Sequence, residues 1–362
     1  MRKILFFICC FMGVVQLGAQ PIFYHSFFPS FMDKQTAQLQ AQFEKYTALQ
    51  KPWQAALFLG EELRPTQETL QSLEMQIKQG YLHTASVLSF KSGNNEPAGT
   101  IHLYVLSGDE KKILHHTQTF PADTPQQVLL EALFSPLQND SRFYTALLIN
   151  GRGDGTFIEY PKHRLLSLPD LVRALKKYHL YIDVLDLQAC RMGSAFAVNQ
   201  LAQSSRVHYA IVSSELRRGS RKVMYYRLLN HFDKSPLQAA LAAHHELPNA
   251  ADFSVDTSTH NSIVIDISHL KKPFENWMRT LTAADAVPFG WTEFYRFLQT
   301  QNTPPARQLA HALQTAIQAQ WCFSAQTKNL YQDTIPPESD CINGLNINRE
   351  NLHNLRLIYQ PY

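Results

Sequence analysis

The sequence predicts an α/β protein with a mostly parallel sheet flanked by helices, and three observations support this prediction. Segments with the character of buried strands lie at 144–150, 181–190 and 207–215. Helix-like segments at 167–179 and 194–203 separate these strands. The 362 residues are 45% hydrophobic and 11% aromatic, a composition typical of a folded chain with a large core. Strands that alternate with helices form parallel sheets whose crossover helices cover the faces.

The first twenty residues, MRKILFFICCFMGVVQLGAQ, have the three parts of a secretory signal. Arg2 and Lys3 form the positive end, residues 4–15 the apolar stretch, and residues 17–19 a cleavage site. We therefore expect residues 1–19 to be a signal peptide and the mature protein to be exported to a periplasmic or extracellular location. The apolar run is short for a bilayer, so we expect no stable membrane span. An uncleaved anchor is the alternative.

The charge balance excludes partners that are recognised by charge. The formal net charge is +3, and it falls to +1 once Arg2 and Lys3 leave with the signal peptide. Nucleic-acid binding requires a basic patch or stripe, which this sequence does not show. We therefore expect no nucleic-acid partner and no polybasic membrane patch.

The segments before residue 140 form a mixed set of helices and strands. Residues 20–50 form an N-terminal helical segment, because apolar residues recur about every 3.6 positions from 35 to 50. Strands are expected at 53–60, 83–93 and 100–109, and helices at 66–80 and 124–137. Gly80 ends the first of these helices, and Thr124 followed by Pro125 begins the second by a cap and a first-turn proline.

The central segment brings two loops together. The strand 144–150 runs into GRGDG at 151–155, and the strand 181–190 ends at Cys190. One helix, 167–179, joins the two strands, and the right-handed crossover rule then makes their carboxyl ends neighbours. Ligands and chemistry lie at that edge of such sheets. Residues 231–362 contain more helix, a strand at 261–268 and an edge strand at 341–347, which predicts a smaller helical C-terminal subdomain.

Four segments in order, INGRGDG, LSLPDLVRAL, LQACRMGSAFAV and SSELRRGSRKVMYY, resemble the landmarks of the clostripain-like cysteine peptidases. KPWQAALFLGEEL is similar to the opening strand of that family, and NSIVIDISHLKK and GLNI to its C-terminal landmarks. The resemblance runs from about residue 51 to the end. It implies a caspase-type fold, with the peptidase domain at 51–230 and the C-terminal part of the same family region at 231–362.

The resemblance assigns Cys190 as the nucleophile, and the backbone N–H groups of Cys190 and Gly153 as the oxyanion hole. Two positions depart from the family. The catalytic histidine directly precedes this glycine in the family, but Arg152 stands here. The aspartate that shapes a pocket for a basic side chain is replaced by Gln188. Asp186 lies on the same strand face two residues deeper, and we expect it to be a structural hydrogen-bond acceptor.

A guanidinium cannot replace the histidine, because it stays protonated and cannot act as a base and then as an acid. Acid–base assistance is typically worth about 10²–10⁴-fold, so the leading hypothesis is an impaired or inactive homologue that binds a peptide or protein in its cleft. One alternative is an active endopeptidase that uses His163 as its base. Another is a structural or binding protein on a peptidase scaffold. Other histidines lie on segments without a motif: His115, His116, His179 and His208.

Three cysteines remain after the signal peptide: Cys190, Cys322 and Cys341. An odd number in an exported protein implies one pair and one thiol, and Cys322 and Cys341 are the natural disulfide pair. Two buried thiols are the alternative reading of these two residues.

No metal site or cofactor is expected. GRGDG is not followed by a helix, so the dinucleotide-binding fingerprint fails, and its Arg-Gly-Asp tripeptide is common by chance. His244 and His245 are adjacent and lack the i, i+4 spacing and further ligands of a zinc motif.

Overall fold

The computed structural model describes residues 51–60, 66–90, 100–108, 112–160, 164–213, 227–245, 259–282, 287, 291–324 and 329–332. These residues belong to one compact unit that begins at Lys51. The expected signal peptide at 1–19, the helical segment at 20–50 and the edge strand at 341–347 lie outside them.

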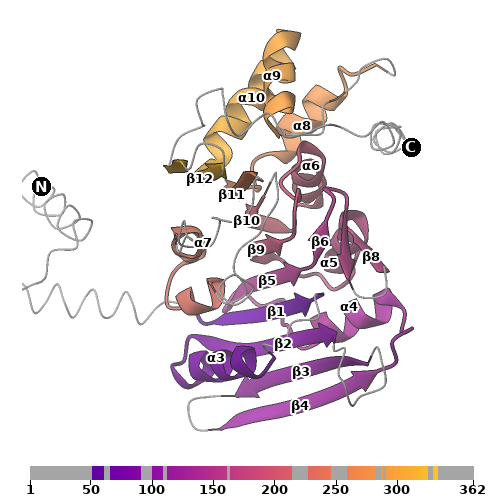
Figure 1. The fold of residues 1–362 in the computed structure, drawn as a ribbon, viewed down its shortest axis with the longest axis vertical. Coiled ribbons are helices and arrows are strands. Elements are labelled where there is room, and N and C mark those ends of the chain that lie inside the picture. Colours follow the sequence, from indigo (N-terminus) through magenta and orange to yellow (C-terminus); the bar gives the residue numbers. More distant parts are fainter. Residues whose placement is uncertain are drawn as a thin grey trace, which may run out of the picture. The chain divides into compact units, whose positions relative to one another are not determined.

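A ten-stranded sheet forms the centre of the molecule (Figure 1), in the order β13-β12-β11-β10-β9-β5-β1-β2-β3-β4. Its strands are β1 (Trp53–Leu59), β2 (Leu82–Phe90), β3 (Ile101–Gly108), β4 (Ile113–Phe120), β5 (Tyr144–Asn150), β9 (Ile182–Gln188), β10 (Val207–Val212), β11 (Thr259–Asp266), β12 (Ile317–Ser324) and β13 (Asn329–Gln332). The middle strands β2, β1, β5, β9 and β10 are parallel, and antiparallel strands extend the sheet on both sides. The expected mostly parallel sheet is confirmed.

A separate three-stranded antiparallel sheet follows β5, in the order β6-β7-β8. Its strands are β6 (Arg152–Gly153), β7 (Phe157–Tyr160) and β8 (Arg164–Ser167). The GRGDG segment therefore continues into strand β7 and opens no helix, as its sequence predicts. Arg164 anchors β8, because its guanidinium donates 3.0 Å to the carbonyl oxygen of Ala122 and lies 5.2 Å from the ring of Tyr160.

Helices cover both faces of the large sheet. The helices are α3 (Thr66–Lys78), α4 (Gln126–Phe134), α5 (Leu168–Lys177), α6 (Ala195–Ser204), η2 (Leu228–His231), α7 (Pro236–His245), α8 (Lys271–Met278), α9 (Trp291–Gln301) and α10 (Pro304–Ala316). Residues of α4, α5, α6, α8, α9 and α10 share one core cluster, and those of α3, η2 and α7 share another. Each face of the sheet therefore has its own apolar layer, and we call the second one the α7 face.

Two local expectations were incomplete or wrong. Strand β4 was not expected, because six of its eight residues are exposed and its apolar residues do not alternate. The start of α4 also differs from the prediction, since Pro125 itself occupies the N-cap position and no side chain caps the helix. The helix is held by the packing of its later turns, where Leu129, Leu130 and Leu133 are buried.

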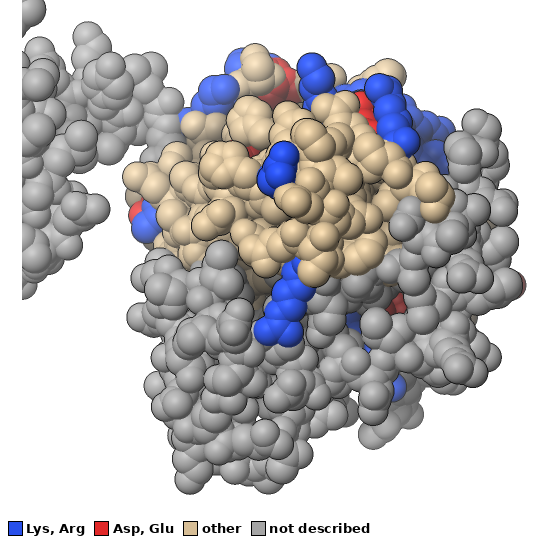
Figure 2. Space-filling model, turned by 90° about the horizontal axis from the view of Figure 1, so that it is seen from above, with Lys and Arg blue, Asp and Glu red and all other residues tan. Residues whose placement is uncertain are grey.

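The C-terminal part continues the fold. Strands β11 to β13 extend the large sheet, while α8, α9 and α10 pack together through Phe274, Trp277 and Phe294. The Trp277 and Phe294 rings meet edge to face at 5.2 Å. Figure 2 looks onto the end of the molecule that carries these helices. Its described surface is largely uncharged, with Lys and Arg side chains standing singly or along its margin. This face thus shows no broad basic patch.

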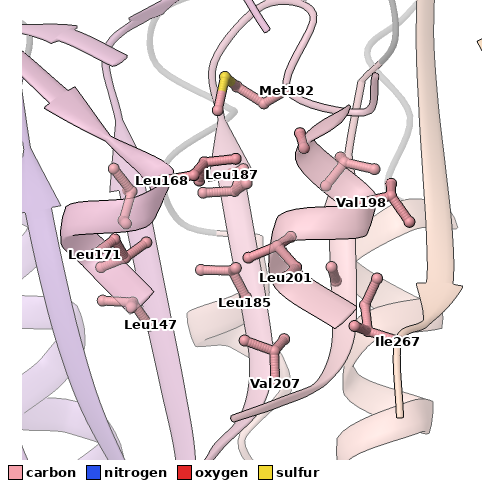
Figure 3. Packing of buried hydrophobic residues seen from close by; sticks show 14 of the residues in the cluster. Leu147, Leu168, Leu171, Leu185, Leu187, Met192, Val198, Leu201, Val207 and Ile267 are labelled. Atoms are coloured by element: carbon pink, nitrogen blue, oxygen red, sulfur yellow. The ribbon is translucent and has the colours of Figure 1, made fainter. Parts of the chain in front are cut away.

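The core around β9 fixes the position of the strand end. Leu185 and Leu187 point between α5 and α6, and both are fully buried (Figure 3). Burying a leucine side chain contributes about 1.5–3 kcal/mol. Met192, four residues beyond Gln188, also enters this cluster and is fully buried. The chain is therefore held in the core on both sides of Cys190.

Candidate functional site

Cys190 lies at the carboxyl edge of the large sheet, two residues after the end of β9. Its thiol is half-buried, so it is neither a fully buried core residue nor a freely exposed one. Strand β5 runs parallel beside β9, and Asn150 pairs with Gln188 at the end of both strands. The GRGDG segment and Cys190 are therefore neighbours, as the crossover rule predicts.

The turn after Cys190 is fixed by its backbone. Arg191 has a φ of 59°, in the left-handed region that residues other than glycine rarely adopt. Gly193 donates its N–H to the carbonyl oxygen of Ser213 at 2.6 Å, which ties the turn to the end of β10. Together with the buried Met192, this bond holds the segment after Cys190 in one conformation.

Ser194 connects this turn to the GRGDG segment. Its hydroxyl caps α6 by accepting from the N–H of Ala197 at 3.1 Å, and it donates to the carbonyl oxygen of Gly155 at 3.1 Å. Within GRGDG, the Asp154 carboxylate accepts from the backbone N–H groups of Thr156 and Phe157, each at 2.8 Å. The two loops at this edge thus form one hydrogen-bonded unit.

Gly153 packs directly on the backbone of Cys190. A Cβ at this position would overlap the carbonyl oxygen of Cys190, and it would stand 2.9 Å from Cγ of Met192 and 3.0 Å from Cβ of Ala189. Only glycine fits here without displacement of the Cys190 turn. The structure therefore brings together the two residues that the sequence resemblance assigned to the nucleophile and the oxyanion hole.

Arg152 is one residue before this contact and is exposed. It lies on β6 directly opposite Glu159 of β7, so the two side chains share a face of the small sheet. Opposite charges at such a position stabilise a strand pair by about 0.2–1 kcal/mol. The position that precedes the Cys190-contacting glycine is therefore held in a strand and carries a cation.

A row of buried polar side chains crosses the sheet at the same edge, on the α7 face. We call it the polar row. Its members lie on β5, on β9, directly after β10 and on β11, and they are Asn150, Gln188, Ser213 and Ser262. Their exposed fractions lie between 0% and 4%. In sheets of this kind ligands bind outside the carboxyl ends of the strands, and the polar row lies at that edge. Sequence reasoning singled out only Gln188 from this row.

Gln188 is hydrogen-bonded to its own strand, β9, and to the neighbouring strand β5. Its side-chain Nε2 donates 2.8 Å to Oδ2 of Asp186, and its backbone carbonyl accepts from Nδ2 of Asn150 at 3.3 Å. Asp186 is 1% exposed. The expectation that Asp186 is a structural hydrogen-bond acceptor is confirmed, and the amide of Gln188 is the group that faces this carboxylate.

Replacing Gln188 with glutamate is expected to destabilise the protein at neutral pH. The change puts a second carboxylate against the buried Asp186, and two carboxylates at that distance cannot both be ionised. The folded state would then bind a proton that the unfolded chain releases, so the loss should grow as the pH rises above about 4–5. Urea unfolding at pH 4.5 and pH 7.5 measures this, with Gln188→Met as the uncharged control. Equal losses for both variants at both pH values would contradict the expectation.

The histidines named from the sequence are distant from Cys190. His179 and His208 lie at the opposite edge, before β9 and at the start of β10. Cys190 is about 25 Å from that edge at the usual rise per strand residue. His115 and His116 lie on β4, five strand positions from β9, which is also about 24 Å. None of these four side chains can act on Cys190.

His244 is the described histidine that sequence reasoning weighed only as a metal ligand. It lies on α7, is 3% exposed, and its Nδ1 is 3.3 Å from the hydroxyl of Ser262 in the polar row. Ser262 is on β11, two strand positions from β9, which is about 10 Å. The contact with Ser262 places His244 beside the polar row.

The remaining residues that the sequence predicts for the site lie outside the part of the chain that the structure describes. His163 and Cys341 are not among the described residues, and neither is the side chain of Cys322, so the proposed base and the proposed disulfide stay predictions. In the described part of the chain, no three side chains of His, Cys, Asp or Glu are grouped to hold a metal ion. No helix in that same part is long and apolar enough to cross a membrane.

Comparison with known proteins identifies the fold. An inactive zymogen of a C11 protease from Parabacteroides distasonis aligns with a TM-score of 0.54 and 13% identity, over 86% of this chain and 96% of its own. The chain has the fold of the C11 proteases. A secreted C11 cysteine protease from Bacteroides thetaiotaomicron, iotapain, aligns with a TM-score of 0.49 and 12% identity, over 74% of this chain and 86% of its own. No protein-family model and no curated protein matches the sequence.

Proposed function

We propose that this protein is a clostripain-like peptidase homologue that binds peptides at the Cys190 edge and hydrolyses them poorly or not at all. The observation that carries the proposal is the contact between Gly153 and the backbone of Cys190. That contact fixes the residue before Gly153 beside the thiol turn, and this residue is Arg152. The site therefore keeps a nucleophile and an oxyanion-binding backbone, and it has a cation in the place of the base.

The chemistry of each group supports peptide binding without efficient hydrolysis. A cysteine peptidase needs a thiolate, hydrogen-bond donors for the oxyanion and a proton for the departing amine. Cys190 and Gly153 supply the first two. Arg152 holds its proton at every physiological pH, so it cannot take the proton of the thiol or give one to the amine. Binding and polarisation of a peptide carbonyl remain possible at such a site, while turnover is lost.

The polar row suggests which side chain a bound peptide presents at the site. Its four side chains carry hydroxyl and amide groups and no net charge, and Asp186 is already bonded to Gln188. Hydroxyl and amide groups at this edge would pair best with an uncharged side chain that both donates and accepts hydrogen bonds. We therefore propose that the bound peptide presents an amide or hydroxyl side chain next to Cys190, in place of lysine or arginine.

We also propose that the protein acts outside the cytoplasm. The support is the three-part leader at residues 1–19. The relative from Bacteroides thetaiotaomicron is described as secreted, which agrees with an exported protein.

Thiol labelling of the native mature protein tests the proposal. A peptide chloromethyl ketone with glutamine at its reactive end should add one label at pH 7, at Cys190, as read by intact mass and peptide mapping. The same protein should not cleave a pool of peptides in which each of the twenty amino acids stands in turn before the bond to be cleaved. Cys190→Ala should abolish the label.

Cleavage of that pool, with loss of cleavage in Cys190→Ala, would overturn the proposal. Loss of that cleavage in His163→Ala as well would establish the alternative of an active enzyme with a different base. If Cys190 reacted only after unfolding, only the alternative of a structural or binding protein on a peptidase scaffold would remain.

A further inference from the structure

Strand β4 forms one edge of the large sheet, far from the Cys190 site. Among the described strands it pairs only with β3, and it does so without a bulge from Ile113 opposite Gly108 to Phe120 opposite Ile101. On its other side, every second residue turns its N–H and C=O groups outward, as in an edge strand. The opposite edge of the sheet, β13, is only four residues long.

The side chains of β4 are exposed on both faces. Residues 114–119 are all exposed, and Leu114, the largest apolar one, is 54% exposed. Successive side chains of a strand point to opposite faces, so the middle of β4 is open on both faces. Its ends reach the core, because Phe120 is buried in one apolar cluster and Ile113 packs against the other. In the exposed middle, Nε2 of His115 lies 3.7 Å from the Glu74 carboxylate of α3.

None of the usual protections of an edge strand is present in β4. Natural edges are kept from pairing by bulges, proline, short length or charged residues, lysine above all. The sequence ILHHTQTF contains no Lys, Arg, Asp, Glu or Pro, and the strand is regular over eight residues. A regular, uncharged and exposed edge is suited to pair with another strand.

The strand is also compatible with a second copy of itself. Two β4 edges related by a two-fold axis pair antiparallel. Residues that face each other across the interface must both turn their N–H groups toward the other strand or both turn them away. The residue numbers of each facing pair are therefore both odd or both even, so the axis passes through one residue of the strand. A centre at Thr117 places Leu114 opposite Phe120, His115 opposite Thr119, and His116 opposite Gln118.

This register is better matched than its neighbour. With the centre at Thr117, an apolar residue meets an aromatic one, and threonine meets itself, both of which are favourable cross-strand pairs. A centre at His116 would place Leu114 opposite Gln118 and stack two histidines on each other.

We infer that β4 is a dimerisation edge, at which two copies of this protein join their sheets antiparallel around Thr117. Strand pairing of this length buries little surface, so the dimer is weak and depends on protein concentration. The Cys190 sites of the two copies lie at distant positions along the joined sheet and stay accessible.

Cross-linking tests the register directly. Opposed Cα atoms in antiparallel strands are about 4.5–5.5 Å apart, which a disulfide can bridge. Thr117→Cys should therefore form a disulfide-linked dimer under mild oxidation in the full mature chain. Thr119→Cys lies on the same face of the strand, but its two copies would be offset by about 13 Å, so it should not cross-link. Equal cross-linking of both variants, or of neither, would overturn the assignment.

Sedimentation across a concentration series tests the dimer without added thiols. The wild-type protein should shift from monomer to dimer, and Thr117→Lys should weaken that association at least tenfold, because like charges would meet at the axis. Val128→Lys, at an exposed position of α4, is the matched control and should leave association unchanged. A wild-type protein that stays monomeric throughout, or equal effects of the two lysines, would overturn the proposal.

Discussion

Replacing Arg152 with histidine is expected to raise peptide hydrolysis by the mature protein at least 100-fold. According to the proposed function, the substitution supplies the group that the site needs, an imidazole that can take the thiol proton and return it to the departing amine. Acid–base assistance of this kind is typically worth about 10²–10⁴-fold. The backbone at this position is already placed by Gly153, which packs on the Cys190 turn. Release of fluorescence from a peptide pool at pH 7 measures the gain.

Two matched variants separate this gain from other causes. Arg152→Ala removes the cation without adding a base and should stay as slow as the starting protein. Arg152→His combined with Cys190→Ala should also be inactive, because the nucleophile is then missing. If Arg152→His matched Arg152→Ala in every peptide, position 152 would not be the place of the catalytic base, and the proposed reason for inactivity would be wrong.

Replacing Gly153 with alanine is expected to destabilise the protein by about 2 kcal/mol, within the range for overpacked sites. The added methyl group would overlap the carbonyl oxygen of Cys190 and crowd Met192, whose side chain is fully buried. Neither neighbour can yield cheaply, since one is backbone and the other is packed between β9 and the helices around it. Urea unfolding gives the free energy, and the labelling rate of Cys190 reports the displaced turn.

The neighbouring variant Arg152→Ala serves as the control for this second prediction as well. Its side chain is exposed, and exposed substitutions usually change stability by less than about 0.5 kcal/mol. A Gly153→Ala protein as stable as Arg152→Ala, with the labelling rate of Cys190 unchanged, would show that the contact between the two loops is not rigid.

The strands of the central sheet were predictable because they are buried on both faces. Segments such as 144–150 and 182–188 are short, rich in Leu, Ile and Val, and almost entirely buried, which is the pattern of a central strand. Strand β4 was missed for the opposite reason: residues exposed on both faces follow neither the alternation nor the apolar run that marks a strand. The capping of α5 by Ser167 was predictable because its bond to the N–H of Asp170 is local in sequence.

By itself, the sequence determined the α/β fold class and the neighbouring positions of GRGDG and Cys190. Those features follow from local patterns and from the handedness of crossovers. Only the tertiary structure decided that Gly153 touches the Cys190 backbone, that Gln188 bonds Asp186, and that Ser213 and Ser262 complete a polar row. Contacts of this kind join strands that are distant in sequence, and their partners are fixed by strand order and register, which no local pattern encodes.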